Sequence, residues 1–190
     1  LEADDAEHPG WFVTGPISND HKWRASVQGM FRERDGGRQY NVTLKKDVGA
    51  GRFDGVQGDL AFVDANVEGR LTVFSMRTND DGQWAVPNAV AGSSITPTTG
   101  SYRIVASPVE SYTRVKQDGA TFKLSANLSG VKVTSITGYS HLSDAWRQDF
   151  SGGVSLGGPR VALFDRISDT GQHQFSEEVQ VSGKALQNKL

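Results

Sequence analysis

The sequence lacks cysteine altogether. This absence excludes a disulfide framework, a thiolate metal site and a cysteine nucleophile. The sequence also lacks a run of 18 apolar residues, so no helix of it is expected to cross a bilayer. The sequence also has no large excess of charge of one sign, since its 190 residues include 20 Lys and Arg and 22 Asp and Glu. With a pI of about 6.1 and scattered basic residues, a nucleic-acid partner is not expected.

The first ten residues, LEADDAEHPG, are acidic and begin without Met. They carry neither the basic region nor the apolar core of a signal peptide. The last residues, SGKALQNKL, end as abruptly. We therefore expect the chain to be an internal fragment of a longer product.

Alternation dominates what is present, and no amphipathic helix stands out. Apolar or small residues alternate with polar ones in 23–31, 53–62, 67–78, 120–128 and 175–181. This period of two predicts strands with one apolar and one polar face. Some residues break the pattern: Met30 stands among the polar positions of the first segment, Phe74 and Met76 fall on the polar side, and Glu177 falls on the apolar side.

The stretch VKVTSITGYSHLSDAWRQDF, residues 131–150, is unusual in its length. It is rich in Val, Thr, Ile and Tyr and contains no Pro, which favours extended structure. As one strand it would extend roughly 65 Å, whereas strands of soluble proteins usually have about 5–6 residues. It is also too polar to be buried on both faces. A strand that crosses a membrane and continues beyond it accounts for both properties.

Short and long links alternate along the chain. The short links are 17–20, 64–66 and the two-residue turn 129–130; the long links are 34–52, 79–119 and 150–172. A meander with short turns at one end and long loops at the other is typical of outer-membrane β-barrels. The sequence thus predicts an all-β, antiparallel meander of long strands that is part of a transmembrane β-barrel. Alone, it would be an open sheet with poorly packed long loops. The seven expected strands are 10–17, 22–33, 52–62, 67–78, 120–128, 131–149 and 173–184.

Three segments resemble a known family. FVTGPISNDHKWRASVQGMFRERDG, residues 12–36, resembles the early barrel of TonB-dependent outer-membrane receptors, where V-S-G-P-[IL]-S-D precedes a strand ending in R-D-G. VKVTSITGYSHLSDAWRQDFSG, residues 131–152, is similar to the family's L-T-S-I-T-[AG]-Y-R strand and the Q-D that often follows. HQFSEEVQVSG, residues 173–183, resembles its Q-x-S-Q-E-[LI]-R-L-S strand. The segments occur in the family's order and cover about a third of the chain.

The resemblance implies a barrel of about 22 strands with a plugged lumen. Residues 1–190 would be a partial barrel domain, without the plug and the C-terminal strands. The implied function is TonB-dependent uptake of a scarce ligand, such as an iron–siderophore chelate, across the bacterial outer membrane. The implied partners are outer-membrane lipid, TonB through the missing plug segment, and the small-molecule ligand.

Candidate ligand contacts lie in the longest loop, which in the family closes over the ligand. Asp80 and Asp81 belong to an acidic turn that could contact a cationic or metal-chelate ligand. Trp84 could stack on a sugar or an aromatic chelate. The alternative is a purely structural role, in which Asp80 and Asp81 only begin a loop and Trp84 anchors it.

Polar side chains of the alternating strands should face the lumen, where they could pair across strands or contact the plug. These residues are Arg24, Gln28, Arg32, Gln57, Asp59, Glu68, Arg70, Lys123 and Asn127.

No catalytic or metal site is expected. The four histidines share no metal-ligand spacing, and there is no G-x-S-x-G, phosphate-binding loop or calcium loop. We therefore expect no enzyme activity and no cofactor. Two alternatives stay open: a passive porin-type barrel, and a secreted β-sandwich that binds carbohydrate. The sandwich would have shorter strands, a drier core face and mixed loop lengths, and the mean hydropathy of -0.44 fits it slightly better.

Overall fold

The computed structural model describes residues 9–34, 39–81, 101 and 103–183. The ordered elements in these ranges are β-strands. Within them, no helix is long and apolar enough to cross a membrane.

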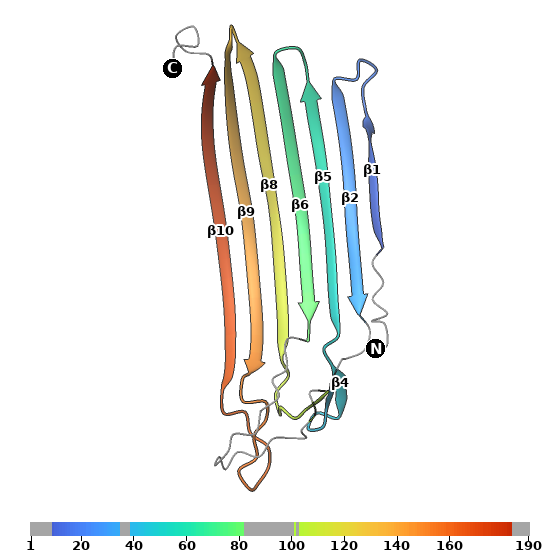
Figure 1. Ribbon diagram of the computed structural model, residues 1–190, viewed down its shortest axis with the longest axis vertical. Helices are drawn as coiled ribbons and strands as arrows, with labels where there is room; N and C mark the ends of the chain where they lie inside the picture. Colours follow the sequence, from blue (N-terminus) through green and yellow to red (C-terminus); the bar gives the residue numbers. More distant parts are fainter. Residues whose placement is uncertain (1–8, 35–38, 82–100, 102, 184–190) are drawn as a thin grey trace.

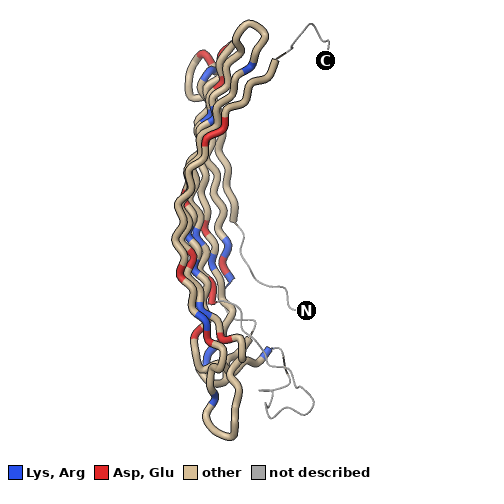
Figure 2. Tube along the Cα trace, turned by 90° about the vertical axis from the view of Figure 1, so that its left-hand side faces the viewer, with Lys and Arg blue, Asp and Glu red and all other residues tan. Residues whose placement is uncertain are grey.

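Seven long strands form one antiparallel sheet in which each strand pairs with the next along the chain (Figure 1). They are β1 (Gly10–Pro16), β2 (Trp23–Arg34), β5 (Gly51–Val63), β6 (Val67–Asp80), β8 (Tyr112–Leu128), β9 (Val131–Asp149) and β10 (Asp165–Gly183). The sheet is open, since β1 and β10 are its two edges. Seen from the side, it is a single layer (Figure 2). The all-β meander of long strands is therefore confirmed.

Two strand boundaries differ from the sequence prediction by more than two residues. β8 begins at Tyr112 rather than at 120, and β10 begins at Asp165 rather than at 173. The added segments, YTRVKQDG and DRISDTGQ, are polar on both faces and show no apolar alternation. They are extended because the long neighbouring strands supply backbone partners, for example Asp80 opposite Thr113 and Asp149 opposite Asp165.

Link length separates the two ends of the sheet, as predicted. At one end the strands are joined by 17–22, 64–66 and the pair Ser129–Gly130. Ser129 and Gly130 both have positive φ, which a two-residue type I′ hairpin turn requires. At the other end lie the long connections after β2, β6 and β9 (Figure 1).

The described parts of the long loops are well packed, so for them the prediction of poor packing was wrong. Their described parts contain a small sheet of β4 (Lys46–Val48), β3 (Gln39–Asn41) and β7 (Ile104–Val105). The described parts of the loops after β2 and β6, together with residues 149–164, form what we call the loop lobe. Apart from Ser125 and Thr134, the buried side chains of the described residues lie here: Asn41, Val48, Val105, Ala106, Ser107, Ser111, Asp149, Ser151 and Val154.

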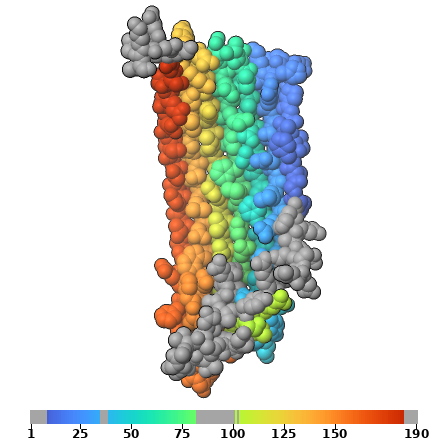
Figure 3. Space-filling model, viewed as in Figure 1, coloured from blue at the N-terminus to red at the C-terminus, as the bar shows by residue number. Residues whose placement is uncertain are grey.

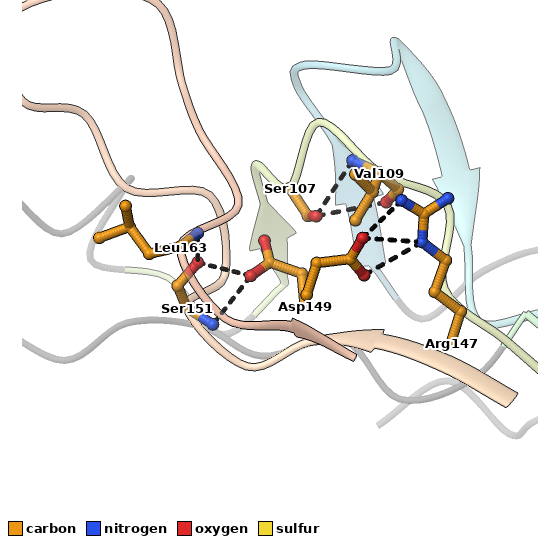
Figure 4. A network of polar contacts seen from close by, with 7 residues as sticks. Ser107, Val109, Arg147, Asp149, Ser151 and Leu163 are labelled. Carbon is orange, nitrogen blue, oxygen red and sulfur yellow. Dashed lines mark hydrogen bonds and ion pairs between the residues drawn. The ribbon is translucent and has the colours of Figure 1, made fainter. Parts of the chain in front are cut away.

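Two buried polar side chains hold the loop lobe together. The Asn41 amide donates to the Ser107 carbonyl at 3.0 Å, and its Oδ1 accepts from the backbone N–H of Thr43 at 3.0 Å. The Asp149 carboxylate accepts from the backbone N–H of Ser151 at 2.9 Å (Figure 4). It also accepts from the backbone N–H of Gly153 at 2.9 Å. These hydrogen bonds give partners to loop N–H and C=O groups. A buried group of this kind without a partner would cost about 1–3 kcal/mol of stability. The lobe escaped the sequence analysis because it depends on contacts between loops far apart in the chain.

Candidate functional site

The strand register gathers the apolar side chains of six strands on one face of the sheet. One cross-strand row runs from Ala25 through Leu60 and Leu71 to Phe122. We call this surface the apolar band. Its main residues are Trp23, Ala25, Val27, Val56, Leu60, Phe62, Val67, Leu71, Val73, Ala120, Phe122, Leu124, Ala126, Leu128, Val131, Val133, Phe175, Val179 and Val181.

No second layer of described residues covers the band. On β8, an interior strand of the sheet, Phe122 is 45% exposed and Leu124 is 41% exposed. Figure 3 shows one face of the sheet, on which the strands are uncovered over most of their length, and the side view of Figure 2 shows no second layer of described residues along the long strands. Soluble monomers rarely expose contiguous apolar patches larger than a few hundred Å². This surface therefore needs a partner or a membrane to cover it.

The height of the band matches a bilayer. On β8 it runs over nine residues, 120 to 128, and on β9 over nine, 131 to 139. Nine residues of strand extend about 27 Å, and a tilted membrane strand needs about 9–11 residues. The register also assigns the faces of β9, whose sequence has no strongly apolar face, because it places Val133 between Ala126 and Val181 and Val131 beside Leu128.

Aromatic rings mark both edges of the band. Trp23 and Phe62 pack against each other at the short-turn edge, with ring centroids 5.0 Å apart. At the loop edge, Tyr139 contacts His173 through a 2.9 Å hydrogen bond between its hydroxyl and Nδ1, and His173 stacks on His141. Rings that are apolar at one end and polar at the other are enriched at membrane interfaces.

Glu177 is the one carboxylate of the described residues within the band, and two hydroxyls support it. Its oxygens accept hydrogen bonds from Ser135 at 3.2 Å and Thr137 at 2.9 Å. All three lie on the edge pair β9–β10. The hydroxyls replace part of the hydration that the carboxylate would lose in an apolar environment.

The opposite face of the sheet is polar. The nine side chains predicted to face a lumen all lie there by register: Arg24, Gln28, Arg32, Gln57, Asp59, Glu68, Arg70, Lys123 and Asn127. Asp59 is the centre of a cross-strand network, because it accepts from Thr72 at 2.6 Å and from Ser26 and Gln57 at 3.2 Å each. That this face lines a lumen stays a prediction.

The predicted ligand contacts lie near the loop lobe. Asp80 ends β6 on the polar face, where its carboxylate lies against Gly51. Asp81 follows, and its backbone N–H donates to the Ala50 carbonyl at 3.0 Å. Trp84 lies outside the described residues. Ligand contact by these three residues therefore stays a prediction.

Near Asp80 the polar face carries a cavity of about 360 Å³. It is lined by Met30, Arg32, Arg34, Gly51, Phe53, Thr78 and Asp80. Gly51 leaves room for the Asp80 carboxylate, because a Cβ there would lie 2.2 Å from Asp80 Oδ1 and the side chain would have to move. Arg34 is anchored through hydrogen bonds of 2.9 and 2.5 Å to the Gly49 carbonyl.

A larger neighbouring cavity, of about 680 Å³, was missed by the sequence analysis. Phe12, Met30, Phe53, Phe74 and Met76 line it from β1, β2, β5 and β6. The signal was present, because Phe74 and Met76 are the residues that break the alternation of β6. It could not be interpreted alone, since Met30 and Phe53 join them only through the register.

Beyond the band, the β9–β10 pair ends in an ion pair beside the lobe. The Arg147 Nε donates to both Asp165 oxygens, at 3.0 and 3.1 Å (Figure 4). These hydrogen bonds lower the pKa of the Asp165 carboxyl. Elsewhere in the described ranges, no three His, Asp or Glu side chains come together as a metal site would require.

Comparison with known proteins shows a likeness in fold. No protein-family model matches the chain, and no curated protein sequence matches it significantly. The structure is similar to that of the siderophore receptor PiuA from Acinetobacter baumannii, with a TM-score of 0.73 and 14% sequence identity. The match covers 97% of this chain and 26% of that receptor. The chain therefore shares its fold with about a quarter of that protein, as an antiparallel sheet that is not closed.

Proposed function

We propose that this chain is a part of the barrel wall of a TonB-dependent receptor of the bacterial outer membrane. The apolar band carries this proposal. Its nine-residue height, its aromatic edges and its exposure are what a lipid-facing wall needs. The polar face would then line the lumen and contact the plug, which lies outside this sequence in the proposed receptor.

Two further observations support the receptor over a passive pore. The segments 12–36, 131–152 and 173–183 resemble receptor sequences, and the fold is similar to that of a siderophore receptor. By this proposal the receptor imports a scarce small molecule, such as a ferric siderophore, with energy delivered through TonB.

The β-sandwich alternative is not favoured by the arrangement of layers. A sandwich needs a second sheet about 10 Å away that covers the apolar face. In the described residues the seven-stranded sheet is a single layer, and the small three-stranded sheet belongs to the loop lobe (Figure 2). The segregation of short and long links also has no role in a sandwich.

The test compares two neighbouring residues on opposite faces. Leu71→Arg places a guanidinium in the middle of the band, where the bilayer cost is about 2–4 kcal/mol. We expect it to reduce membrane assembly and to lower the free energy of unfolding in lipid. Thr72→Arg, one residue on, places the same group beside Asp59 on the polar face, and we expect near-normal assembly.

Fractionation of cells and urea unfolding in lipid vesicles provide the readout. Equal effects of both substitutions, or a protein that stays in solution without detergent, would contradict the lipid-facing band. If assembly follows the prediction, uptake of a ferric chelate in cells with and without TonB separates the receptor from a passive porin.

A further inference from the structure

The polar face has one apolar region, which lies toward the loop lobe. Four rows of paired residues define it along β2, β5 and β6: Gln28–Gln57–Phe74, Met30–Gly55–Met76, Arg32–Phe53–Thr78 and Arg34–Gly51–Asp80. Phe12 on β1 adds a third ring, and it lies beside Gln28. We call this region the aromatic hollow, and its cavity of about 680 Å³ adjoins the 360 Å³ cavity beside Asp80 through shared Met30 and Phe53.

Two glycines lie beneath rings of the hollow and explain the position of these rings. A Cβ on Gly55 would lie 3.1 Å from the Phe53 ring, and one on Gly119 would lie 2.6 Å from the Phe74 ring. The two rings thus lie over glycine backbone, an arrangement that stabilises a glycine within a strand. This structural role does not extend to Phe12 and Met30, which are 61% and 52% exposed. Apolar side chains this exposed on a polar face call for a bound partner.

The rim of the hollow is cationic on the side of the loop lobe. Arg32 is exposed, and none of the carboxylates in the described residues pairs with it. Arg34 adds a second positive charge that is held in place by the Gly49 carbonyl. Asp80 offsets one of the two charges. An anionic group therefore gains most by lying next to Arg32 while its apolar part covers the rings.

We infer that the aromatic hollow binds an anionic ferric chelate whose iron ligands are carried on aromatic rings. A cavity of several hundred Å³ with an apolar floor and a few polar groups is typical of small-molecule sites. Phe53 and Phe74 supply surfaces for ring stacking, and Arg32 attracts the negative charge of the chelate. This inference rests on the proposed receptor function and names the chemical class of its ligand.

The experiment measures binding to the intact receptor, purified from membranes in detergent. The probe is the anionic iron(III) complex of 2,3-dihydroxybenzoate, and an iron(III) complex of an aliphatic trihydroxamate is the comparison ligand. Phe74→Leu and Arg32→Gln should each weaken binding of the aromatic chelate about five- to tenfold. Phe122→Leu, a matched change on the opposite face, should leave binding unchanged. The aliphatic chelate should bind weakly and be indifferent to Phe74→Leu.

Three outcomes would overturn the inference. One is binding of the aromatic chelate that neither substitution changes, and another is no binding of it at all. The third comes from Met30→Cys: a thiol that a water-soluble maleimide cannot reach in the ligand-free receptor would mean that another segment of the protein fills the hollow. Membrane assembly of the Leu71→Arg and Thr72→Arg variants is measured separately, so failure here is distinguishable from failure of the receptor proposal.

Discussion

At the residue scale, the polarity of the side chains on each face of the sheet decides whether that face can lie against lipid or against water. Leu71 and Thr72 are neighbours in sequence, yet one lies in the apolar band and the other donates to Asp59. The same logic explains Glu177, whose place in the band is supported by two hydroxyls. Charged side chains outside the band interact with their near neighbours. The best-defined of these ion pairs joins Arg147 and Asp165.

This ion pair predicts a pH dependence of the loop lobe. Because Arg147 lowers the pKa of folded Asp165, the pair stabilises the fold above the ordinary Asp pKa of about 3.9. This contribution is lost as pH falls from that value through the lowered one. The methyl NMR signals of buried Val154 report lobe packing between pH 7 and pH 3.

Arg147→Gln provides the control for this titration. The variant should have a weaker lobe at pH 7 and a smaller loss of stability on acidification, since Asp165 then lacks its partner. The same acid transition in both proteins would show that the ion pair does not contribute.

At the element scale, strands were predictable where a side-chain pattern exists and not where partners alone impose the conformation. The alternation in 120–128 predicts half of β8, but 112–119 is a strand only because β6 and β9 flank it. The lobe follows the same rule, because Asn41 meets Ser107 across a sequence separation of 66 residues. The candidate cavities were likewise hidden until the register placed Met30 next to Gly55 and Met76.

Gly153 should be essential for the loop lobe. Its φ is +76°, and a Cβ would lie 2.1 Å from the Ala106 carbonyl oxygen, so Gly153→Ala should separate the loops. Gly157→Ala is the matched control, because φ is +87° there with open space around the Cβ position. Gly157→Ala should lower the free energy of unfolding only by the cost of a positive φ at alanine, which is about 1–2 kcal/mol.

Limited proteolysis within 150–164 measures the difference. We expect much faster cleavage in Gly153→Ala than in Gly157→Ala, with the long strands intact in both. Equal cleavage rates would mean that the backbone conformation, and not loop packing, sets the stability of this segment.

At the scale of the whole molecule, the sheet has two exposed faces and two unpaired edges. An open sheet of this kind exposes backbone groups on β1 and β10 that favour pairing with further strands. Strands that continue the sheet would satisfy those edges, and lipid would cover the band. The loop lobe lies beyond the band at one end of the sheet (Figure 1). Long extracellular loops have this position in outer-membrane β-barrels.

The most direct test of this account is a spin-label scan of residues 120–128 in lipid bilayers. The absence of cysteine from the sequence lets a single introduced thiol be labelled at each position. We predict that labels at even positions, from Ala120 to Leu128, collide with dissolved oxygen and are shielded from a water-soluble nickel chelate. Labels at odd positions, such as Lys123 and Asn127, should show the reverse. Water accessibility on both faces, or no alternation at all, would contradict a membrane-facing band.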